Sequence, residues 1–195
     1  MNPVPARPIT RRALWILPFG LAGAAAVLIR NQNRTTDVPA VEDASQEVTI
    51  ARFDKTGARV DLVRVQRVTH SEAEWQKLLA PQQYYVTRQR RTDPAFTGTY
   101  YRSHERALFR CVCCGEALFS SDAKYDSGTG WPSFRAPIAK ENLRTRRELG
   151  ATLFTGIEVT CARCGAHLGH IFDDGPAPTH LRYCINESAL RMEDL

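Results

Sequence analysis

Four of the six cysteines stand in two copies of one short motif. Residues 111–115 read CVCCG and residues 161–165 read CARCG, so each copy sets two thiols three positions apart before a glycine. This spacing lets a tight turn aim both sulfurs at one metal ion, and the glycine lets the backbone turn away from it. We therefore predict one structural zinc ion with no open coordination position, held by Cys111, Cys114, Cys161 and Cys164.

Two other arrangements of these thiols stay open. Cysteines in an oxidising compartment can form disulfides, and a single C-x-x-C can be a redox pair. Two matched copies favour the metal site, whose binding energy would contribute directly to folding. Cys113, the extra thiol of the first copy, has a poor spacing for a ligand, so we interpret it as free.

The sixth cysteine, Cys184, stands alone in the run RYCIN, residues 182–186. In a strand, period-two alternation puts Arg182, Cys184 and Asn186 on one face. A free thiol has a pKa of about 8.5, and a guanidinium beside it favours the reactive thiolate. From this run alone, a reactive site and a buried structural cysteine are equally good interpretations.

Histidines and carboxylates precede Cys184 by a few residues. The run HLGHIFDDGP, residues 167–176, contains His167 and His170 together with Phe172 and Asp174. A lone histidine is more often structural, but two imidazoles close to a candidate nucleophile favour a role in proton transfer. We therefore interpret this run as part of a site.

A glycine-rich turn, SGTGWPSF at residues 127–134, carries two aromatic residues. Core packing is the plainer interpretation of Trp131 and Phe134. The functional interpretation is that they form the wall of a small apolar pocket.

Short β-prone runs must position these groups. ALFRC, ATLFTGIEVTC and LRYCI are separated by glycine- and proline-rich segments. Alternating runs on both sides of residues 54–57 (DKTG) indicate a hairpin, and a capping box at Ser71–Glu74 begins a short helix that Pro81 closes. The sequence predicts one mainly β domain over residues 47–195 with a small helical element near its start.

Residues 1–40 have the layout of an export signal, and a polar linker follows them to about residue 46. Residues 13–29 (ALWILPFGLAGAAAVLI) carry no charge, and Arg11 and Arg12 stand directly before them, as in a twin-arginine signal. We expect export to the periplasm or to the outer face of the inner membrane. The leader is either cleaved or kept as a membrane anchor, and a buried helix of the domain is a third interpretation.

The net charge of +5 is concentrated in this leader. Residues 1–40 hold five arginines and one acidic residue, which leaves 21 basic and 20 acidic residues for the rest of the chain. A nearly neutral domain argues against nucleic acid as a partner.

Together, these motifs resemble the type B methionine sulfoxide reductases, which act on the R epimer. The resemblance runs from Glu74 to Met192 and covers AFTG (95–98), both cysteine motifs, KYDSGTGWPSF (124–134), HLGHIFDDGP and RYCIN. It implies two antiparallel β-sheets with short helices, a structural zinc ion and no organic cofactor. The substrate would be methionine-R-sulfoxide, free or in oxidised proteins, and the reductant a thioredoxin-like protein or another thiol.

The same resemblance implies roles for single residues. Cys184 would attack the sulfoxide sulfur and become a sulfenic acid, with His170 or His167 as the proton donor. The groups around the nucleophile would be His167, His170, Asp174, Arg182 and Asn186. The substrate would contact Trp131, Phe134 and Phe172.

Three positions depart from that family's pattern. Many members carry a resolving cysteine in the form SGCGWPSF, where this chain has Thr129. Either an external thiol reduces the sulfenic acid directly, or Cys113 replaces the missing cysteine. We favour the external thiol, because Cys113 lies within a metal motif. His180 and Glu187 stand where the family usually has glycine and serine.

Two other classes of function fit parts of the sequence. A zinc-held binding module would leave Cys184 buried and unreactive. A cysteine hydrolase that pairs Cys184 with His167 or His170 would need an oxyanion hole and a substrate cleft, which nothing in the sequence indicates.

Overall fold

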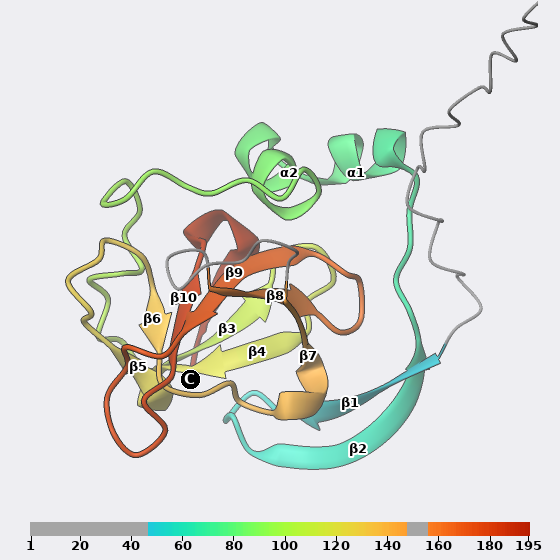
Figure 1. Cartoon of the computed structure of the whole chain (residues 1–195). Coiled ribbons are helices and arrows are strands. Elements are labelled where there is room, and N and C mark those ends of the chain that lie inside the picture. The colour runs from blue at the N-terminus through green and yellow to red at the C-terminus, as the bar shows by residue number, and fades with distance from the viewer. Residues whose placement is uncertain (1–46, 148–155) are drawn as a thin grey trace, which may run out of the picture. The chain divides into compact units, whose positions relative to one another are not determined.

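The computed structural model of the chain describes residues 47–147 and 156–195 (Figure 1). The strands are β1 (Glu47–Phe53), β2 (Arg59–Gln66), β3 (Ala107–Cys111), β4 (Ala117–Ser120), β5 (Lys124–Tyr125), β6 (Ser133–Phe134), β7 (Leu143–Arg146), β8 (Ile157–Cys161), β9 (His167–Phe172), β10 (Arg182–Ile185) and β11 (Leu190–Asp194). The helices are α1 (Glu72–Leu78) and α2 (Pro81–Thr87), with short 3₁₀ turns η1 (Ser121–Ala123), η2 (Lys140–Asn142) and η3 (Glu187–Ala189).

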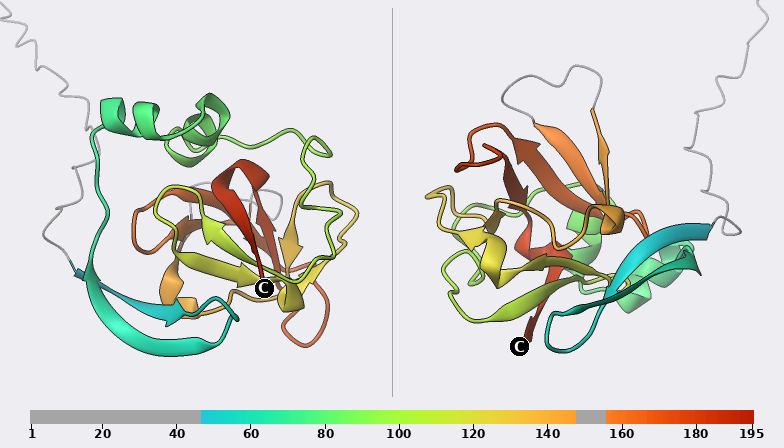
Figure 2. Two further views of the ribbon diagram at one scale, coloured as in Figure 1. Left: turned by 180° about the vertical axis from the view of Figure 1, so that it is seen from behind. Right: turned by 90° about the horizontal axis from the view of Figure 1, so that it is seen from below.

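These strands form three antiparallel sheets. The largest has the order β5-β6-β10-β9-β8-β7, a second has the order β11-β3-β4, and β1 and β2 form a hairpin. Figure 2 shows the two larger sheets as separate layers with the hairpin at one side. The predicted fold class, mainly β with antiparallel sheets and short helices, is confirmed, and the hairpin adds a sheet to the two that were expected.

Aromatic side chains from both larger sheets form the centre of the core. Phe119 and Phe134 stack with their ring centroids 4.4 Å apart, and Phe109 meets Phe134 edge-on at 5.0 Å. Tyr183 of β10 joins this cluster through Phe119. Burial of large apolar side chains is the main favourable term in folding, so these rings hold the two layers together.

Strand β10 shows how the core positions the opposite face. Tyr183 and Ile185 are buried among the core residues. Because successive side chains of a strand point to opposite faces, Arg182 and Cys184 must point away from that core. The predicted alternation is therefore present from Arg182 to Ile185, whereas Asn186 follows the end of the strand.

The β1–β2 hairpin also forms as its alternation predicts. The Asp54 carboxylate accepts a hydrogen bond from the backbone N–H of Thr56 at 2.8 Å, which fixes the turn. Val48 and Ile50 face inward and pack against Ala162, a residue of the second cysteine motif. The hairpin thus covers one of the two turns that carry the candidate metal ligands.

The helical element consists of two helices. At the start of α1, the backbone N–H of Ser71 donates to the Glu74 carboxylate at 2.8 Å and the backbone N–H of Glu74 donates to the Ser71 hydroxyl at 3.3 Å, which is the predicted capping box. The helix ends before Pro81, as expected. Pro81 also begins α2, a second helix that was not predicted. Proline is tolerated at the first position of a helix because the N–H that it lacks would be unpaired there.

The predicted leader, linker and candidate anchor at residues 13–29 lie outside the described residues. Residues 151–155, the first part of the run ATLFTGIEVTC, also lie outside them. In the described parts of the chain, no helix has the length and apolar character needed to cross a membrane.

Candidate active site

A row of side chains crosses the six-stranded sheet on the face that points away from the core. Directly opposed residues of antiparallel strands carry their side chains on the same face. The register places one residue of each strand in this row, from β5 to β7: Tyr125, Ser133, Cys184, His170, Glu158 and Arg146. Cys184 therefore lies between a hydroxyl group and an imidazole.

Cys184 is half-buried in the middle of β10. Its sulfur is within hydrogen-bonding reach of the Thr129 hydroxyl and of the Arg182 guanidinium. Burial raises the pKa of Cys184 above its ordinary value, and Arg182 and Thr129 offset only part of that rise. The expected influence of Arg182 is present, but the net shift favours the protonated thiol in the free protein.

Arg182 is held by two partners on the same face. Its Nε and Nη2 atoms donate to the two carboxylate oxygens of Asp174, both at 2.8 Å. Its guanidinium carbon lies 4.5 Å from the ring centroid of Phe172, which is its cross-strand partner on β9. The hydrogen bond and charge of Arg182 lower the pKa of Asp174, so the pair stays charged at neutral pH. A fixed positive charge is thereby kept beside Cys184.

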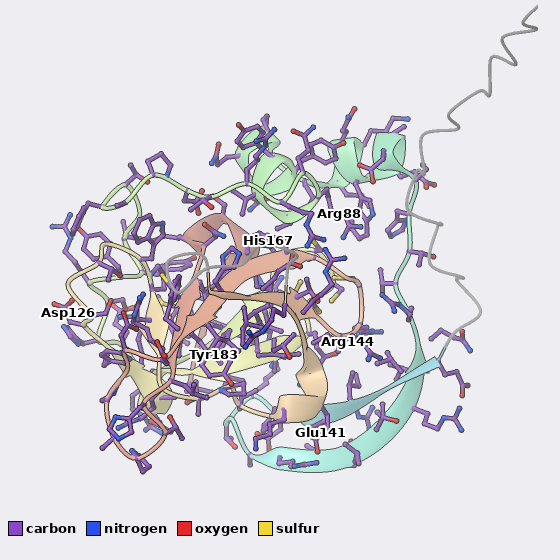
Figure 3. The ribbon with its side chains drawn as sticks, viewed as in Figure 1. Arg88, Asp126, Glu141, Arg144, His167 and Tyr183 are labelled. Carbon is purple, nitrogen blue, oxygen red and sulfur yellow. The ribbon has the colours of Figure 1, made fainter. Side chains whose placement is uncertain are left out.

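His167 lies at the start of β9 on the side of the sheet toward α2 (Figure 3). Its Nδ1 atom is 2.9 Å from an oxygen of Glu158, while its buried Nε2 atom has no hydrogen-bond partner among the described residues. The ring meets His170 edge-on, with the centroids 5.3 Å apart. Since a carboxylate only accepts, Nδ1 must carry the proton that joins the pair.

Glu158 is a site residue that the sequence reasoning missed. Burial acts to raise its pKa, but the hydrogen bond with His167 and the charges of Arg90 and Arg146 prevail and lower it. The carboxylate forms ion pairs with both arginines. A single acidic residue inside the apolar run IEVTC was the signal that could have found it, because an unpaired carboxylate is rarely buried.

Asn186 lies at the end of β10 and is 3% exposed. Its side-chain oxygen accepts from the backbone N–H of Asp93 at 2.9 Å, and its amide nitrogen donates to the carbonyl of Leu168 at 3.1 Å. Both polar ends of the side chain are thus engaged with backbone. Asn186 therefore connects the loop at Asp93 to β9 beside the site, which is the role of a positioning residue.

Asp93 is a second residue that the sequence reasoning missed. Its backbone carbonyl accepts from Trp131 Nε1 at 2.9 Å, which fixes the indole ring. Its carboxylate accepts from the backbone N–H and the hydroxyl of Ser188, both at 2.8 Å, and from the Gln82 amide at 2.9 Å. Trp131 itself is half-buried beside the glycine-rich turn, where an apolar wall was predicted.

Phe134 does not lie with these residues. It is completely buried between Phe109 and Phe119, on the core face of β6, whereas its neighbour Ser133 shares the face of Cys184. The alternation of the strand separates the two side chains. The prediction that Phe134 contacts the substrate is therefore corrected: it supports the sheet from beneath, while Phe172 lies on the site face under Arg182.

A chain of hydroxyl groups adjoins Cys184 at the glycine-rich turn. The Ser127 hydroxyl is 2.8 Å from that of Thr129 and 2.7 Å from that of Ser133. Ser133 in turn lies 3.1 Å from the carbonyl of Trp131, to which it donates. Each hydroxyl carries one proton, so Thr129 can donate to the Cys184 sulfur only when Ser127 donates to Thr129 and Ser133 donates to Ser127, which releases the Trp131 carbonyl.

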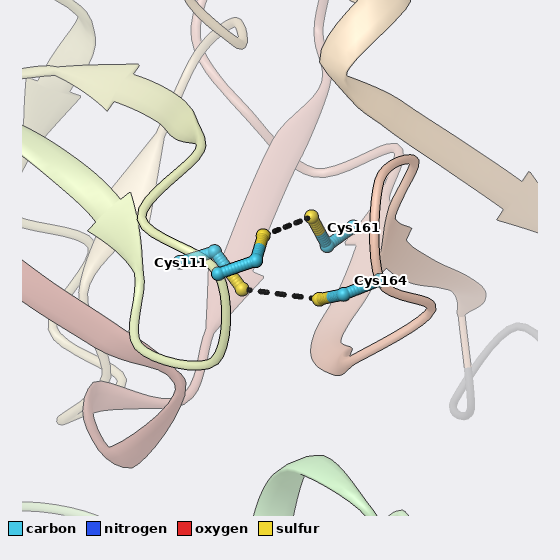
Figure 4. Close-up of side chains that lie close together, drawn as sticks. Cys111, Cys161 and Cys164 are labelled. Atoms are coloured by element: carbon cyan, nitrogen blue, oxygen red, sulfur yellow. Dashed lines mark hydrogen bonds between the residues drawn. The ribbon is translucent and has the colours of Figure 1, made fainter. Parts of the chain in front are cut away.

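The four cysteines of the two motifs come together at the turns that follow β3 and β8 (Figure 4). Their sulfurs all lie within 4.8 Å of one another, with Cys111 and Cys164 at 3.6 Å and Cys114 and Cys161 at 3.6 Å. A disulfide requires about 2.05 Å, whereas thiolates at about 2.3 Å from a tetrahedral zinc ion lie roughly 3.8 Å apart. The geometry and the donor set fit zinc.

Comparison with known proteins agrees with this arrangement. A family model described as the SelR domain matches residues 79–194. Peptide methionine sulfoxide reductase MsrB of Methanosarcina barkeri is 48% identical over 126 residues, 65% of this chain and 88% of that protein. MsrB of Hahella chejuensis is 49% identical over 125 residues, 64% of this chain and 89% of that protein. The chain belongs to the type B methionine-R-sulfoxide reductases.

Another relative of this reductase family extends beyond the shared region. Peptide methionine sulfoxide reductase B1, chloroplastic, of Arabidopsis thaliana is 52% identical over 125 residues, which make up 64% of this chain but 61% of that protein. The matched family segment begins after the β1–β2 hairpin. Membership of this family makes the chain an oxidoreductase that acts on sulfur groups.

Glu187 and His180, the two positions expected above to depart from the family pattern, lie outside the contacts of Cys184. The Glu187 carboxylate accepts from the backbone N–H groups of Thr99 at 2.9 Å and Tyr100 at 2.7 Å, so it anchors the loop before β3. His180 has a φ of 56°, a left-handed conformation that glycine adopts without strain. Neither side chain takes part in the contacts of Cys184 described above.

Proposed function

We propose that this chain reduces methionine-R-sulfoxide, free or within oxidised proteins, to methionine by direct attack of Cys184 on the sulfoxide sulfur. The observation that carries this proposal is the placement of Cys184 between Ser133 and His170, with the Arg182 guanidinium in hydrogen-bonding reach of its sulfur. A sulfur nucleophile with a charged donor and an imidazole beside it has what the transfer of an oxygen atom requires.

The step balances without a further reactant. The Cys184 thiol and the sulfoxide R–S(=O)–CH₃ give the sulfenic acid Cys184–SOH and the thioether R–S–CH₃, so two electrons pass from the Cys184 sulfur to the substrate sulfur. A Cys184 that begins as a thiol already carries the proton that the transferred oxygen needs. His170, its cross-strand partner, is placed to carry that proton from sulfur to oxygen.

The surrounding residues act on charge and position. Arg182, fixed by Asp174 and Phe172, favours the thiolate during attack and stabilises negative charge on the departing oxygen. His167, anchored by the Glu158 carboxylate, adjoins His170 and supports its orientation. Trp131, whose indole is held by the Asp93 carbonyl, supplies an apolar surface for the methyl group.

We propose that an external thiol, such as a thioredoxin-like protein, reduces the sulfenic acid. Thr129 occupies the position of the usual resolving cysteine and is within reach of the Cys184 sulfur, so no thiol stands there. The Cys113 sulfur lies 3.4 Å from the hydroxyl of Thr87, the last residue of α2. Cys113 is thus placed between the first cysteine motif and α2. These contacts favour a Cys113 that takes no part in recycling.

We further propose that the four-cysteine cluster holds one structural zinc ion. Four thiolates leave no open position, so the ion would supply stability rather than chemistry at the sulfoxide. Cys111, Cys114, Cys161 and Cys164 would tie the turn after β3 to the turn after β8.

Export remains a proposal that rests on the sequence of residues 1–40. A twin-arginine-like leader would deliver the folded domain to the periplasm, free or tethered through residues 13–29. N-terminal sequencing of the protein recovered from a periplasmic fraction tests this. A chain that stays with the cytoplasmic fraction would contradict it.

The assay that tests the main proposal compares the two epimers of dabsylated methionine sulfoxide with dithiothreitol as the reductant. We expect the native protein to convert the R epimer to the thioether and to leave the S epimer unchanged. Failure to convert the R epimer under these conditions would refute the proposed function.

A further inference from the structure

Tyr125 belongs to the same row of side chains as Cys184. It forms half of the two-residue strand β5 and is paired with Ser133, which is paired with Cys184. Its ring therefore stands on the site face, one strand beyond the hydroxyl that adjoins the nucleophile. No role for this residue followed from the sequence motifs.

The phenol hydroxyl of Tyr125 is shielded from solvent and has no hydrogen-bond partner among the described residues. Two other tyrosine hydroxyls of the domain have partners: Tyr84 donates to Glu72 at 2.7 Å, and Tyr100 accepts from the backbone N–H of Met192 at 3.4 Å. A shielded hydroxyl that lacks a partner destabilises a protein, and a phenylalanine would fill the same space without that cost. The Tyr125 hydroxyl can therefore donate a hydrogen bond to a group that is bound beside it.

The charges around Tyr125 are those of the site. Burial raises the pKa of its phenol, Arg182 opposes the rise, and Asp174 and a Cys184 thiolate add to it. The hydroxyl consequently keeps its proton at neutral pH. It lies close enough to the nucleophile and to the Arg182–Asp174 pair for each of them to influence its pKa.

We propose that Tyr125 Oη–H donates a hydrogen bond to the oxygen atom that moves from the substrate sulfur to Cys184, both in the sulfoxide and in the sulfenic acid. This inference rests on the proposed function. The balanced step is the one given above: the S–O bond of the sulfoxide breaks, a bond forms between that oxygen and the Cys184 sulfur, and the Cys184 proton ends on the oxygen. Tyr125 keeps its own proton throughout and acts by hydrogen bonding alone.

The experiment is a single turnover without reductant, comparing the native protein with Tyr125→Phe and with Tyr183→Phe. Tyr183 is the matched control, because it lies beside Cys184 in sequence but points into the core. We expect Tyr125→Phe to form methionine from the R epimer on the order of tenfold more slowly, as the loss of one donor to the transferred oxygen implies, with a thermal midpoint equal to or above the native one. We expect Tyr183→Phe to react within about twofold of the native rate.

Two results would overturn the proposal: a native rate in Tyr125→Phe, or a slower rate accompanied by a lowered thermal midpoint, which would assign the residue a structural role. If the native protein itself forms no methionine, the proposed function fails instead, so the two failures are distinguishable.

A second experiment tests whether Tyr125 acts on the oxygen or on the rest of the substrate, by comparing the inhibition constants of two small ligands. Dimethyl sulfoxide presents the transferred oxygen, whereas dimethyl sulfide lacks it. We expect the inhibition constant of dimethyl sulfoxide against the R epimer to rise in Tyr125→Phe and that of dimethyl sulfide to stay unchanged. Equal shifts for both, or none for either, would contradict a hydrogen bond to the oxygen.

Discussion

The molecule places cysteine in two contrasting environments. At the turns after β3 and β8, the sulfurs of four thiols all lie within 4.8 Å of one another, with sulfur–sulfur distances of 3.6 Å across the two motifs. On β10, Cys184 meets no second thiol in the described contacts and is surrounded by a hydroxyl, an imidazole and a guanidinium.

This difference shows that the environment of a thiol decides its role. A closed set of four sulfurs satisfies a metal ion completely, so it holds two turns together and offers nothing to a substrate. A single sulfur whose neighbours donate protons or carry charge can accept an oxygen atom and give it up again. Substitutions in the two environments should therefore affect different properties of the protein, stability in the first and activity in the second.

The largest effect is expected from breaking the cluster. Cys161→Ser removes one of the four ligands, and the energy of a zinc–thiolate site, about 10–16 kcal/mol in small zinc peptides, is comparable to the total stability of a domain, about 5–15 kcal/mol. We expect the variant to lose its metal and its cooperative thermal transition. Metal analysis and differential scanning calorimetry measure both.

Cys113→Ser is the matched control for that variant, because Cys113 lies in the same turn but outside the set of four. It should keep its metal and its transition. If the native protein, after removal of its metal, unfolds at an unchanged temperature, then the metal site does not stabilise the fold.

The next effect is expected in activity without any loss of fold. Cys184→Ser removes the nucleophile, so turnover of the R epimer should fall by about a thousandfold or more, with the metal content and thermal midpoint close to native values. Cys113→Ser should turn over at the native rate with an external thiol. Loss of turnover in Cys113→Ser would instead make that thiol a resolving residue.

A third prediction concerns pH. Only the thiolate is alkylated, and burial raises the pKa of Cys184. Its rate of reaction with iodoacetamide should therefore continue to increase above about pH 8.5, the ordinary pKa of a free thiol. Arg182→Gln removes a positive charge that lowers the pKa of Cys184, so this variant should move the pH profile of alkylation to still higher pH. Peptide mass spectrometry isolates the signal of Cys184 from those of the other thiols. A profile that levels off below pH 8 would contradict the dominance of burial.

The smallest effect is expected at the hydroxyl chain. Thr129→Val keeps the shape of the side chain but removes the donor to the Cys184 sulfur, and we expect the single-turnover rate at neutral pH to fall about fivefold, as for one neutral hydrogen bond. Thr129→Ser should restore it. Equal rates in the valine and serine variants would show that the hydroxyl does not act on the sulfur.

Much of this arrangement could be predicted because the signals are local in sequence. The spacing of the cysteine motifs dictates their turns, and the alternation of RYCIN dictates which residues share a face with Cys184. The same rule, applied to β6, separates Phe134 from Ser133 and puts it in the core, which is the plainer of the two interpretations of that residue. Proximity to Trp131 in sequence does not decide the face of a strand.

Other features could not be predicted because they depend on contacts between distant segments. Glu158 meets His167, Asp93 meets Asn186, and Tyr125 joins the row only through the register of three strands. The net pKa shift of Cys184 depends on its burial, which the charge of a neighbouring arginine does not reveal. Tertiary structure supplies these partners and determines which effect prevails.

We propose that Cys184 alone accepts the oxygen and that an external thiol then reduces the sulfenic acid. One turnover of the R epimer without reductant, followed by dimedone labelling and peptide mass spectrometry, tests this proposal. We expect one equivalent of methionine per chain and one dimedone adduct, located on Cys184. Methionine formation that leaves Cys184 unlabelled and joined to Cys113 in a disulfide would contradict it.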